Sequence, residues 1–363
     1  MKKHPLTKSK ISKVLLVAVL AFVLCALMAV LAGCNDPGAT TELGGNLEFV
    51  VPEGPADETF GLNGETPTAL NLFKYEEYED GTIIITGTYT QINELTKVVI
   101  PAVIDGKKVS RVGESAFATL YNLEEIVFSG YIVDVQQYAF RDCWSLKTIK
   151  LSEHVLRLHE GAFQGCKSIS DLSFIVPSVK VLGARAFEGC NGLKKVTIPS
   201  TIDSIGGYTF LNCEYLDTVE FPEGIEEIPE RMFQGCRNLK FTAKDGVVDT
   251  IDVNGKATKG VIIPDSVKKI GDFAFMGCNF KAITLGANIT SIGQSVFANN
   301  VRLDTINMPI TGTVELGKEM FMGCKAIKTI NVKAGSTLES YCKEWADTAS
   351  GLGGYAAVAV NVQ

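Results

Sequence analysis

The chain has 363 residues, 46% of them hydrophobic, and its 34 basic and 41 acidic side chains give a formal net charge of −7. Five lysines precede residue 14, so loss of a leader would leave 29 basic against 41 acidic side chains, a balance of −12. Such a chain lacks the basic face that nucleic-acid phosphates require, which excludes nucleic acid as an expected partner. Attachment to an anionic membrane surface through charge is equally unexpected.

Residues 1–33 have the features of an export signal. After the lysines, an uncharged apolar run over residues 14–32 is long enough to span a bilayer as a helix. It ends in Leu31-Ala-Gly-Cys34, which resembles the lipobox of bacterial lipoprotein signal peptides. The resemblance implies cleavage before Cys34 and lipidation of its thiol, with anchoring to the outer face of a bacterial membrane; an uncut signal anchor is the alternative. Both interpretations predict that the rest of the chain is exported and exposed at the cell surface.

Residues 34–67 are predicted to be a flexible acidic tether. From Asn35 to Pro67 the chain has seven acids, no base, and scattered glycine and proline. Self-repulsion and poor burial disfavour a folded domain, and a coil of this length would span roughly 30 Å.

Residues 68–108 are predicted to form an N-terminal β cap. Asp80-Gly81 and Asp105-Gly106 are hairpin-turn dipeptides between β-prone runs. A stack of repeats ends in an open apolar layer and an unpaired strand edge, so a divergent cap is expected there. Three tyrosines of this segment could cover the end of the core or form an aromatic platform for a sugar: Tyr75, Tyr78 and Tyr89.

A phenylalanine then recurs nine times at a near-constant interval, the successive differences in position being 23, 23, 24, 23, 23, 42, 22 and 24. A cysteine stands three positions after the phenylalanine in seven cases, with Leu120 and Asn300 in the other two. Because one such unit cannot bury its own apolar face, a fixed period of this size predicts a solenoid of stacked units. The paired rows are Phe117, Phe140/Cys143, Phe163/Cys166, Phe187/Cys190, Phe210/Cys213, Phe233/Cys236, Phe275/Cys278, Phe297 and Phe321/Cys324.

Within a unit such as Ile202–Pro222, short apolar–polar alternations separated by Gly and Pro predict two short strands joined by tight corners. Residues 109–332 resemble the BspA-like, or Treponema-type, leucine-rich repeats. The resemblance implies a mostly β, right-handed solenoid on bacterial or protist cell surfaces, linked to adhesion or host-protein binding. We therefore expect nine repeats of about 23 residues with a β-hairpin N-cap and a helix-plus-strand C-cap. A protein or glycan on a host or neighbouring cell is the expected partner.

The cysteine row has three interpretations. Buried free thiols that act as packing groups are favoured, because leucine and asparagine replace cysteine in two units. Disulfides between neighbouring units are chemically permitted in an exported protein. A metal site is disfavoured, because evenly spaced parallel ligands do not converge.

One insertion, residues 242–260, interrupts the array and contains the hairpin dipeptides Asp245-Gly246 and Asn254-Gly255. It lacks the ligand spacing of a calcium loop, so a protruding hairpin is the simpler interpretation. Insertions of this kind often lie on the binding face of a solenoid.

The strand that follows each corner is expected to face the concave side and to present alternate residues to a partner. This candidate face has no aromatic stripe, so strong hot spots are not expected on it. Its candidate residues are Thr148, Lys150, Asp171, Lys195, Thr218, Glu220, Thr305 and Asn307.

Residues 333–363 are predicted to form a C-terminal cap. Ser336-Thr-Leu-Glu339 is a capping-box pattern, and Trp345 shares one helical face with Leu338, Tyr341 and Cys342. Trp345 is interpreted as core rather than as a ligand platform.

No catalytic constellation is recognised in the sequence. His154 and His159 have no nucleophile in a triad pattern, and no phosphate loop or paired-carboxylate site is present. We therefore expect no enzymatic activity, no cofactor and no metal. The leading hypothesis is a lipid-anchored surface protein that binds a macromolecular partner. Capture of glycan or peptide nutrients, and a passive envelope spacer, are the alternatives.

Overall fold

The computed structural model describes residues 49–363 apart from 223, 242–248, 252–256, 260 and 352–356. These residues belong to one unit that extends from Leu43 to Gln363. Among the helices described, none has the length and apolar composition needed to cross a membrane. The apolar run at 14–32, Cys34 and the first part of the predicted tether lie outside the described residues.

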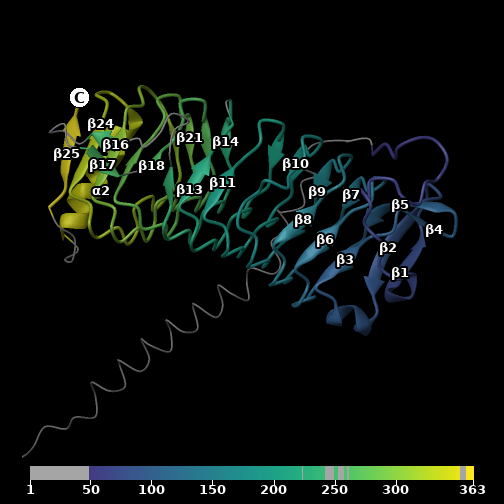
Figure 1. Ribbon diagram of the computed structural model, residues 1–363. Coiled ribbons are helices and arrows are strands. Elements are labelled where there is room, and N and C mark those ends of the chain that lie inside the picture. Colours follow the sequence, from purple (N-terminus) through teal and green to yellow (C-terminus); the bar gives the residue numbers. More distant parts are fainter. Residues whose placement is uncertain (1–48, 223, 242–248, 252–256, 260, 352–356) are drawn as a thin grey trace, which may run out of the picture. The chain divides into compact units, whose positions relative to one another are not determined.

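The described chain coils as a β-solenoid of about nine turns, as expected, with strands following one another from β1 to β25 (Figure 1). Two sets of parallel strands run along the coil, and most repeats contribute one strand to each. The first set, whose outward surface we call the β face, contains β3 (Lys97–Val99), β6 (Glu125–Val127), β8 (Thr148–Lys150), β11 (Lys195–Thr197), β13 (Thr218–Glu220), β15 (Lys240–Phe241), β18 (Val261–Ile262), β20 (Ala282–Thr284), β22 (Thr305–Met308), β24 (Thr329–Val332) and β25 (Ala359–Val362).

The second set of strands is shorter and contains β2 (Ile83–Thr88), β5 (Lys107–Val112), β7 (Asp134–Val135), β9 (Arg157–Leu158), β10 (Val181–Leu182), β12 (Ser204–Ile205), β14 (Glu227–Ile228), β19 (Lys269–Ile270), β21 (Ser291–Ile292) and β23 (Glu315–Leu316). Equivalent residues of successive repeats are in register, for example Val196 with Val219 and Leu158 with Leu182. A constant repeat length therefore places the same residue type at the same height in every turn.

The phenylalanine row is a continuous buried column. All nine rings are fully buried, and consecutive rings stack with centroids 5.1 to 6.1 Å apart and planes 2° to 16° from parallel. Each ring thus contacts the rings of the turns before and after it, and only stacking removes its two faces from water.

The cysteine row lies beside the rings and consists of buried free thiols, from Cys143 to Cys324. Each thiol of the row donates a hydrogen bond to the carbonyl of the phenylalanine one repeat earlier, as Cys213 Sγ does to Phe187 O at 3.2 Å. Asn300, which replaces cysteine in one repeat, donates through Nδ2 to Phe275 O at 2.8 Å. Leu120, the other replacement, belongs to the first repeat, which has no earlier unit to receive such a bond. The position therefore selects a small hydrogen-bond donor.

Cys143, the first thiol of the row, confirms the prediction of buried free thiols and adds a hydrogen bond to it. Its Sγ is fully buried and donates to Phe117 O at 3.1 Å, so the thiol provides a polar partner as well as packing volume. A buried carbonyl without a partner would be costly, which is the physical reason for a donor at this position. The same bond recurs from Cys166 to Phe140 O at 3.1 Å.

The corner that carries each phenylalanine has left-handed backbone two residues before and two residues after the ring. In the repeat of Phe210 these residues are Tyr208 (φ 63°) and Asn212 (φ 57°). The corner N–H groups donate to the next turn, with Phe210 N to Met232 O at 3.0 Å and Asn212 N to Gln234 O at 2.8 Å. These bonds hold even bulky residues in the left-handed region, which costs energy for any residue with a Cβ.

The N-terminal cap is the predicted hairpin unit. Strand β1 (Phe73–Glu77) pairs antiparallel with β2, and β4 (Val103–Ile104) pairs antiparallel with β5. Two short 3₁₀ helices, η2 (Leu70–Leu72) and η3 (Thr90–Glu94), flank these strands. Phe73 meets Phe117 edge-on at 6.2 Å, so an aromatic ring closes this end of the column.

The C-terminal cap is the predicted helix and strand. Helix α2 (Thr337–Gly351) begins with the capping contact expected of its sequence, Glu339 N donating to Ser336 Oγ at 3.3 Å. Trp345 packs edge-on against Phe321 at 5.1 Å and closes the far end of the column. Strand β25 then extends the first set of strands in parallel with β24.

The insertion contains the predicted hairpin pairing, with β16 (Asp249–Ile251) antiparallel to β17 (Ala257–Lys259). The remaining residues of 242–260 lie outside the described part of the chain.

Candidate functional site

The predicted outward residues of the β face are at the predicted positions, with one exception. The central residue of each strand points inward, as Ile149, Val196 and Val219 do, while its neighbours are exposed or half-buried. Six further residues thereby share the β face with Lys150: Thr148, Lys195, Thr218, Glu220, Thr305 and Asn307.

Asp171 is the exception, because its repeat forms no strand on the β face. Its carboxylate Oδ1 accepts a hydrogen bond from Ser173 N at 2.9 Å, and hydrogen bonds from Ser173 lower the pKa of Asp171. This side-chain turn competes with strand pairing. The step from Phe163 to Phe187 is also one position longer than the step before it. Here β8 ends one sheet of the β face and β11 begins the next, with no described strand joining them.

The acidic tether is not free of the body in its described part, which corrects the prediction for residues 34–67. Leu62 is 2% exposed and forms a small apolar cluster with Val99 of β3 and Val127 of β6. Thr68 N donates to Val99 O at 3.0 Å, and Val99 N donates to Thr68 Oγ1 at 2.9 Å. We call residues 57–68 the strap, because they cross the first strands of the β face.

The strap is also held beyond the end of β6. Phe60 lies 4.6 Å from the Tyr131 ring, and Gly130 N donates to Phe60 O at 2.8 Å. A Cβ on Gly61 would stand 2.3 Å from Gly130 N, so this close backbone approach requires glycine. Asp57 N donates to the Tyr131 hydroxyl at 3.0 Å.

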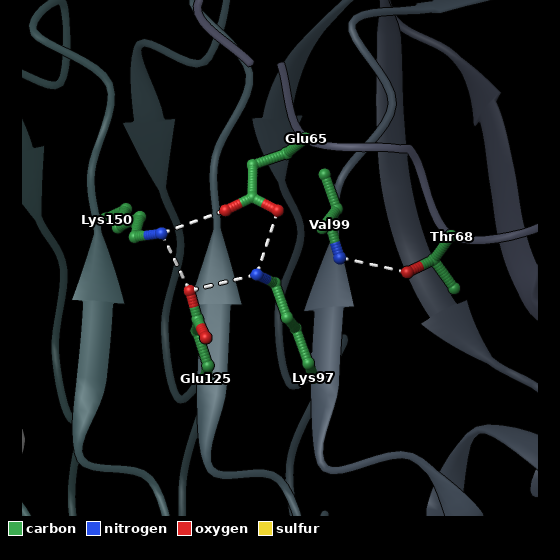
Figure 2. Close-up of polar contacts among 6 residues, drawn as sticks. All are labelled: Glu65, Thr68, Lys97, Val99, Glu125 and Lys150. Atoms are coloured by element: carbon green, nitrogen blue, oxygen red, sulfur yellow. Dashed lines mark hydrogen bonds and ion pairs between the residues drawn. The ribbon is translucent and has the colours of Figure 1, made fainter. Parts of the chain in front are cut away.

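A four-residue charge cluster attaches the strap to the β face, as Figure 2 shows. The Glu65 carboxylate bridges Lys97 and Lys150, at 2.8 and 2.9 Å. Glu125, between these two lysines on β6, contacts Lys150 at 2.9 Å and Lys97 at 3.3 Å. Hydrogen bonds from the lysines lower the pKa of Glu65 and of Glu125, and the two carboxylates raise the pKa of Lys97 and Lys150.

The charge cluster and the contacts of Leu62 show what kind of peptide segment lies on the N-terminal third of the β face. The strap folds in consecutive turns, with Leu62 N donating to Thr59 O at 3.0 Å and Glu65 N to Leu62 O at 2.9 Å. These turns place an aliphatic side chain against two valines and a carboxylate, three residues later, against a pair of lysines. No periodic signal in the sequence marks the strap, because Glu65 and Lys150 are 85 residues apart and belong to different kinds of segment.

The middle of the β face carries a second, smaller charge pair. Lys195 of β11 contacts Glu220 of β13 at 2.7 Å, and Thr197 Oγ1 donates to the same carboxylate at 2.7 Å. The hydrogen bond from Lys195 is the main reason that the pKa of Glu220 is lowered. These groups are exposed or half-buried and no strap residue contacts them in the described part.

The C-terminal part of the β face is a ladder of amides. Asn307, Asn331 and Asn361 stand in register on β22, β24 and β25. Asn307 Nδ2 donates to Thr284 Oγ1 at 3.0 Å, Asn331 Nδ2 to Asn307 Oδ1 at 2.6 Å, and Asn361 Nδ2 to Asn331 Oδ1 at 2.9 Å. The side-chain amides of this ladder therefore already use hydrogen-bonding groups on one another.

The cysteine row lies inside the coil and contributes nothing to the β face. Burial raises the pKa of the Cys166 thiol well above its ordinary value, and a hydrogen bond that this thiol donates to the neighbouring Cys143 adds to the effect. Since a thiolate is the form of cysteine that attacks substrates and binds metals, thiols held protonated in this way are chemically inert. Cys166 is therefore a structural residue of the column, and so is the fully buried Cys143, whose Sγ donates to Phe117 O.

The histidines and cap tyrosines are engaged in structural contacts. His159 Nε2 lies 2.7 Å from the nearly buried carboxylate of Asp134, and His154 Nδ1 lies 3.0 Å from Gly130 O. Arg111 covers the Tyr78 ring at 4.0 Å, and the Tyr75 hydroxyl donates to Asp105 at 3.2 Å. Over the described ranges, no group of three or more potential ligands is placed to hold a metal ion.

The two parallel sets of strands, the buried ring column and the capped ends define a leucine-rich-repeat solenoid with an outward polar face. The family model described as the BspA type leucine rich repeat region, in 6 copies, matches residues 82–176, 173–254 and 253–344. The chain belongs to this BspA-type family, as its repeat sequence predicted. The family and the structural neighbours suggest a non-enzymatic scaffold.

Several solved bacterial structures are similar. A leucine-rich repeat protein from Bacteroides ovatus is 26% identical with a TM-score of 0.57, over 73% of this chain and 70% of that protein. The T. pallidum leucine rich repeat protein is 26% identical, with a TM-score of 0.48 over 59% of this chain and 89% of that one. A leucine rich cell surface protein from Faecalibacterium prausnitzii is 23% identical, with a TM-score of 0.45 over 76% and 85%. No curated protein matches the chain.

Proposed function

We propose that this chain is a lipid-anchored surface protein that binds a protein partner through the β face. Its family is generally involved in protein interaction at the cell surface. The lipobox-like sequence ending in Cys34 supports export and anchoring. The observation that carries the binding proposal is the strap, which is itself a peptide segment folded in consecutive turns and held on the β face through Leu62 and Glu65.

The open part of the β face, from β11 to β22, is where a partner in trans would bind. Its exposed Lys195 and Thr197 and its half-buried Glu220 offer polar and charged groups, and none of them is a bulky anchor. Such a face favours a peptide segment that supplies its own side chains, with charge complementarity setting orientation more than affinity.

The test compares two charge-reversal variants of the intact protein. Lys195→Glu with Glu220→Lys alters the β face, whereas Lys268→Glu with Glu226→Lys alters a more exposed ion pair beside the second set of strands. Purified candidate partners from host and community surfaces are passed over each immobilised protein. We expect one or more partners to be retained by the native and control proteins and lost with the β-face variant.

Equal retention by both variants would contradict binding through the β face. Absence of any retained partner would favour a passive envelope spacer. Anchoring is tested separately by growth with a radiolabelled fatty acid, where label should enter the native chain and disappear in Cys34→Ser.

A further inference from the structure

Four cationic side chains surround one hollow of about 490 Å³ near the C-terminal cap. The hollow is lined by Lys281, Arg302, Lys325 and Lys328, with Asp304 and Ala326 completing it. Four cations and one carboxylate give this small area a net charge of +3, whereas the whole chain has −7. The hollow lies on the turns that precede the β face strands, so it is separate from the binding face proposed above.

The repeat register fixes how these charges are spaced. Lys281, Asp304 and Lys328 immediately precede β20, β22 and β24 and form one column, with Asp304 N donating to Lys281 O and Lys328 N to Asp304 O, both at 2.9 Å. Because paired strands are about 4.8 Å apart, Lys281 and Lys328 are about 10 Å apart along the coil. Arg302 and Lys325 stand on the same turns as Asp304 and Lys328 and widen the column into a patch.

The cations of this patch are poorly compensated. In the same column nearer the N-terminus, Lys147 is paired with Glu124 at 2.7 Å. Here the single carboxylate of Asp304 is 3.7 Å from Lys281 and accepts a bond from the Thr305 hydroxyl at 2.9 Å. Within the residues that the structure describes, Arg302, Lys325 and Lys328 form no ion pair, so the patch presents positive potential to solvent.

We propose that this patch binds a linear polysaccharide whose sulfate or phosphate groups repeat within about 10 Å, the spacing that the strand register sets. The guanidinium of Arg302 offers paired N–H donors to a tetrahedral oxyanion, and the lysines act as point charges on either side. A small single anion would meet only part of the patch and would be screened at so exposed a surface. No aromatic side chain lines the hollow, so the base-stacking platform of single-stranded nucleic-acid sites is missing there.

The experiment uses the intact protein and three fluorescent probes: a heparin-type sulfated oligosaccharide, a phosphate-bearing polysaccharide fragment and a single-stranded polynucleotide of similar charge. The patch variant is Arg302→Gln/Lys325→Gln/Lys328→Gln. The matched control is Lys147→Gln/Lys268→Gln/Lys269→Gln, which removes the same three charges from paired, exposed lysines elsewhere. Kd is measured at several salt concentrations, and thermal unfolding confirms that all proteins are folded.

We expect the patch variant to weaken binding of a sulfated or phosphorylated polysaccharide at least tenfold at low salt, and the control less than twofold. The slope of log K against log salt should fall by about 2 on loss of three charges, if each contributes as much as the roughly 0.7–0.9 that a neutralised phosphate contributes in nucleic acids. Whichever of the sulfated and phosphate-bearing probes binds more tightly shows which of the two classes of polysaccharide the patch prefers. Equal weakening in both variants, salt-independent binding, or tighter binding of the polynucleotide would overturn the proposal.

Discussion

Replacing one central ring of the phenylalanine column measures how far the fold depends on it. Phe210 is fully buried and stacks on Phe187 and Phe233, both 5.9 Å away. Phe210→Ala removes a buried aromatic side chain and leaves a cavity with a ring on either side, which typically costs about 3–5 kcal/mol. The two stacked pairs, worth about 0.5–1.5 kcal/mol each beyond area burial, place the expected loss near the upper end.

Urea unfolding followed by tryptophan fluorescence and circular dichroism gives the free energy of unfolding. Tyr215→Ala in the same repeat is the control, because this side chain is 58% exposed and its loss should cost less than about 0.5 kcal/mol. In a repeat protein, coupling between neighbours holds the array together, so the damaged variant should also lose cooperativity and unfold in two steps. A loss below about 1 kcal/mol with a single transition would refute the idea that the ring column holds the turns together.

Three further outcomes are expected. Leu62→Ala should undock the strap at a cost of about 2 kcal/mol, seen as faster proteolysis before residue 68 with an unchanged urea midpoint, and Leu70→Ala should have no such effect. Asn300→Ala should lower the free energy of unfolding by about 2 kcal/mol because buried backbone groups lose their partner, whereas Asn300→Cys should retain most of it. Burial raises the pKa of the Cys213 and Cys324 thiols to about 12, above the ordinary 9.0, so the unfolded chain loses these protons first. Stability should therefore be complete below pH 9 and fall between pH 9 and 12, by about 1.4 kcal/mol per pH unit for each thiol, and urea midpoints in the Cys213→Ala/Cys324→Ala variant should show a shallower decline.

The periodic part of the fold could be predicted from the sequence because repetition converts sequence spacing directly into spatial register. The interval from Phe187 to Phe210 equals one period of the array, which is enough to stack the two rings whatever the intervening residues do. The same logic fixed the outward residues of β11 and β13. It was wrong for Asp171, although the longer spacing of that repeat and the Asp-x-Ser sequence were visible signals.

The strap could not be predicted, since its contacts are non-periodic and long-range. Its acidic composition predicted self-repulsion. Composition alone does not show that Glu65 lies close enough to Lys97 and Lys150 to form ion pairs.

The individual thiol hydrogen bonds could not be predicted, because the sequence does not show which backbone group lies opposite each buried cysteine. Cys143 and the thiols that follow it each donate to a carbonyl of the preceding turn. Asn300 was the available signal, because an amide in a cysteine row indicates a donor requirement rather than a size requirement.

Docking of the strap changes how a lipid anchor at Cys34, as proposed, would present the solenoid. Lys108 Nζ donates to Pro52 O at 2.6 Å, so the chain already contacts the body at residue 52. From Cys34 to Pro52 there are 18 residue steps, which when fully extended span about 60 Å, whereas 33 steps to Pro67 would span about 110 Å. The contact at Pro52 therefore roughly halves the greatest distance that the β face can reach from an anchor at Cys34. The strap is held by apolar contacts of Phe60 and Leu62, by hydrogen bonds to Val99, Gly130 and Tyr131, and by the charge cluster. A ligand that displaces Glu65 from Lys97 and Lys150 would therefore remove only the salt-sensitive part of this attachment.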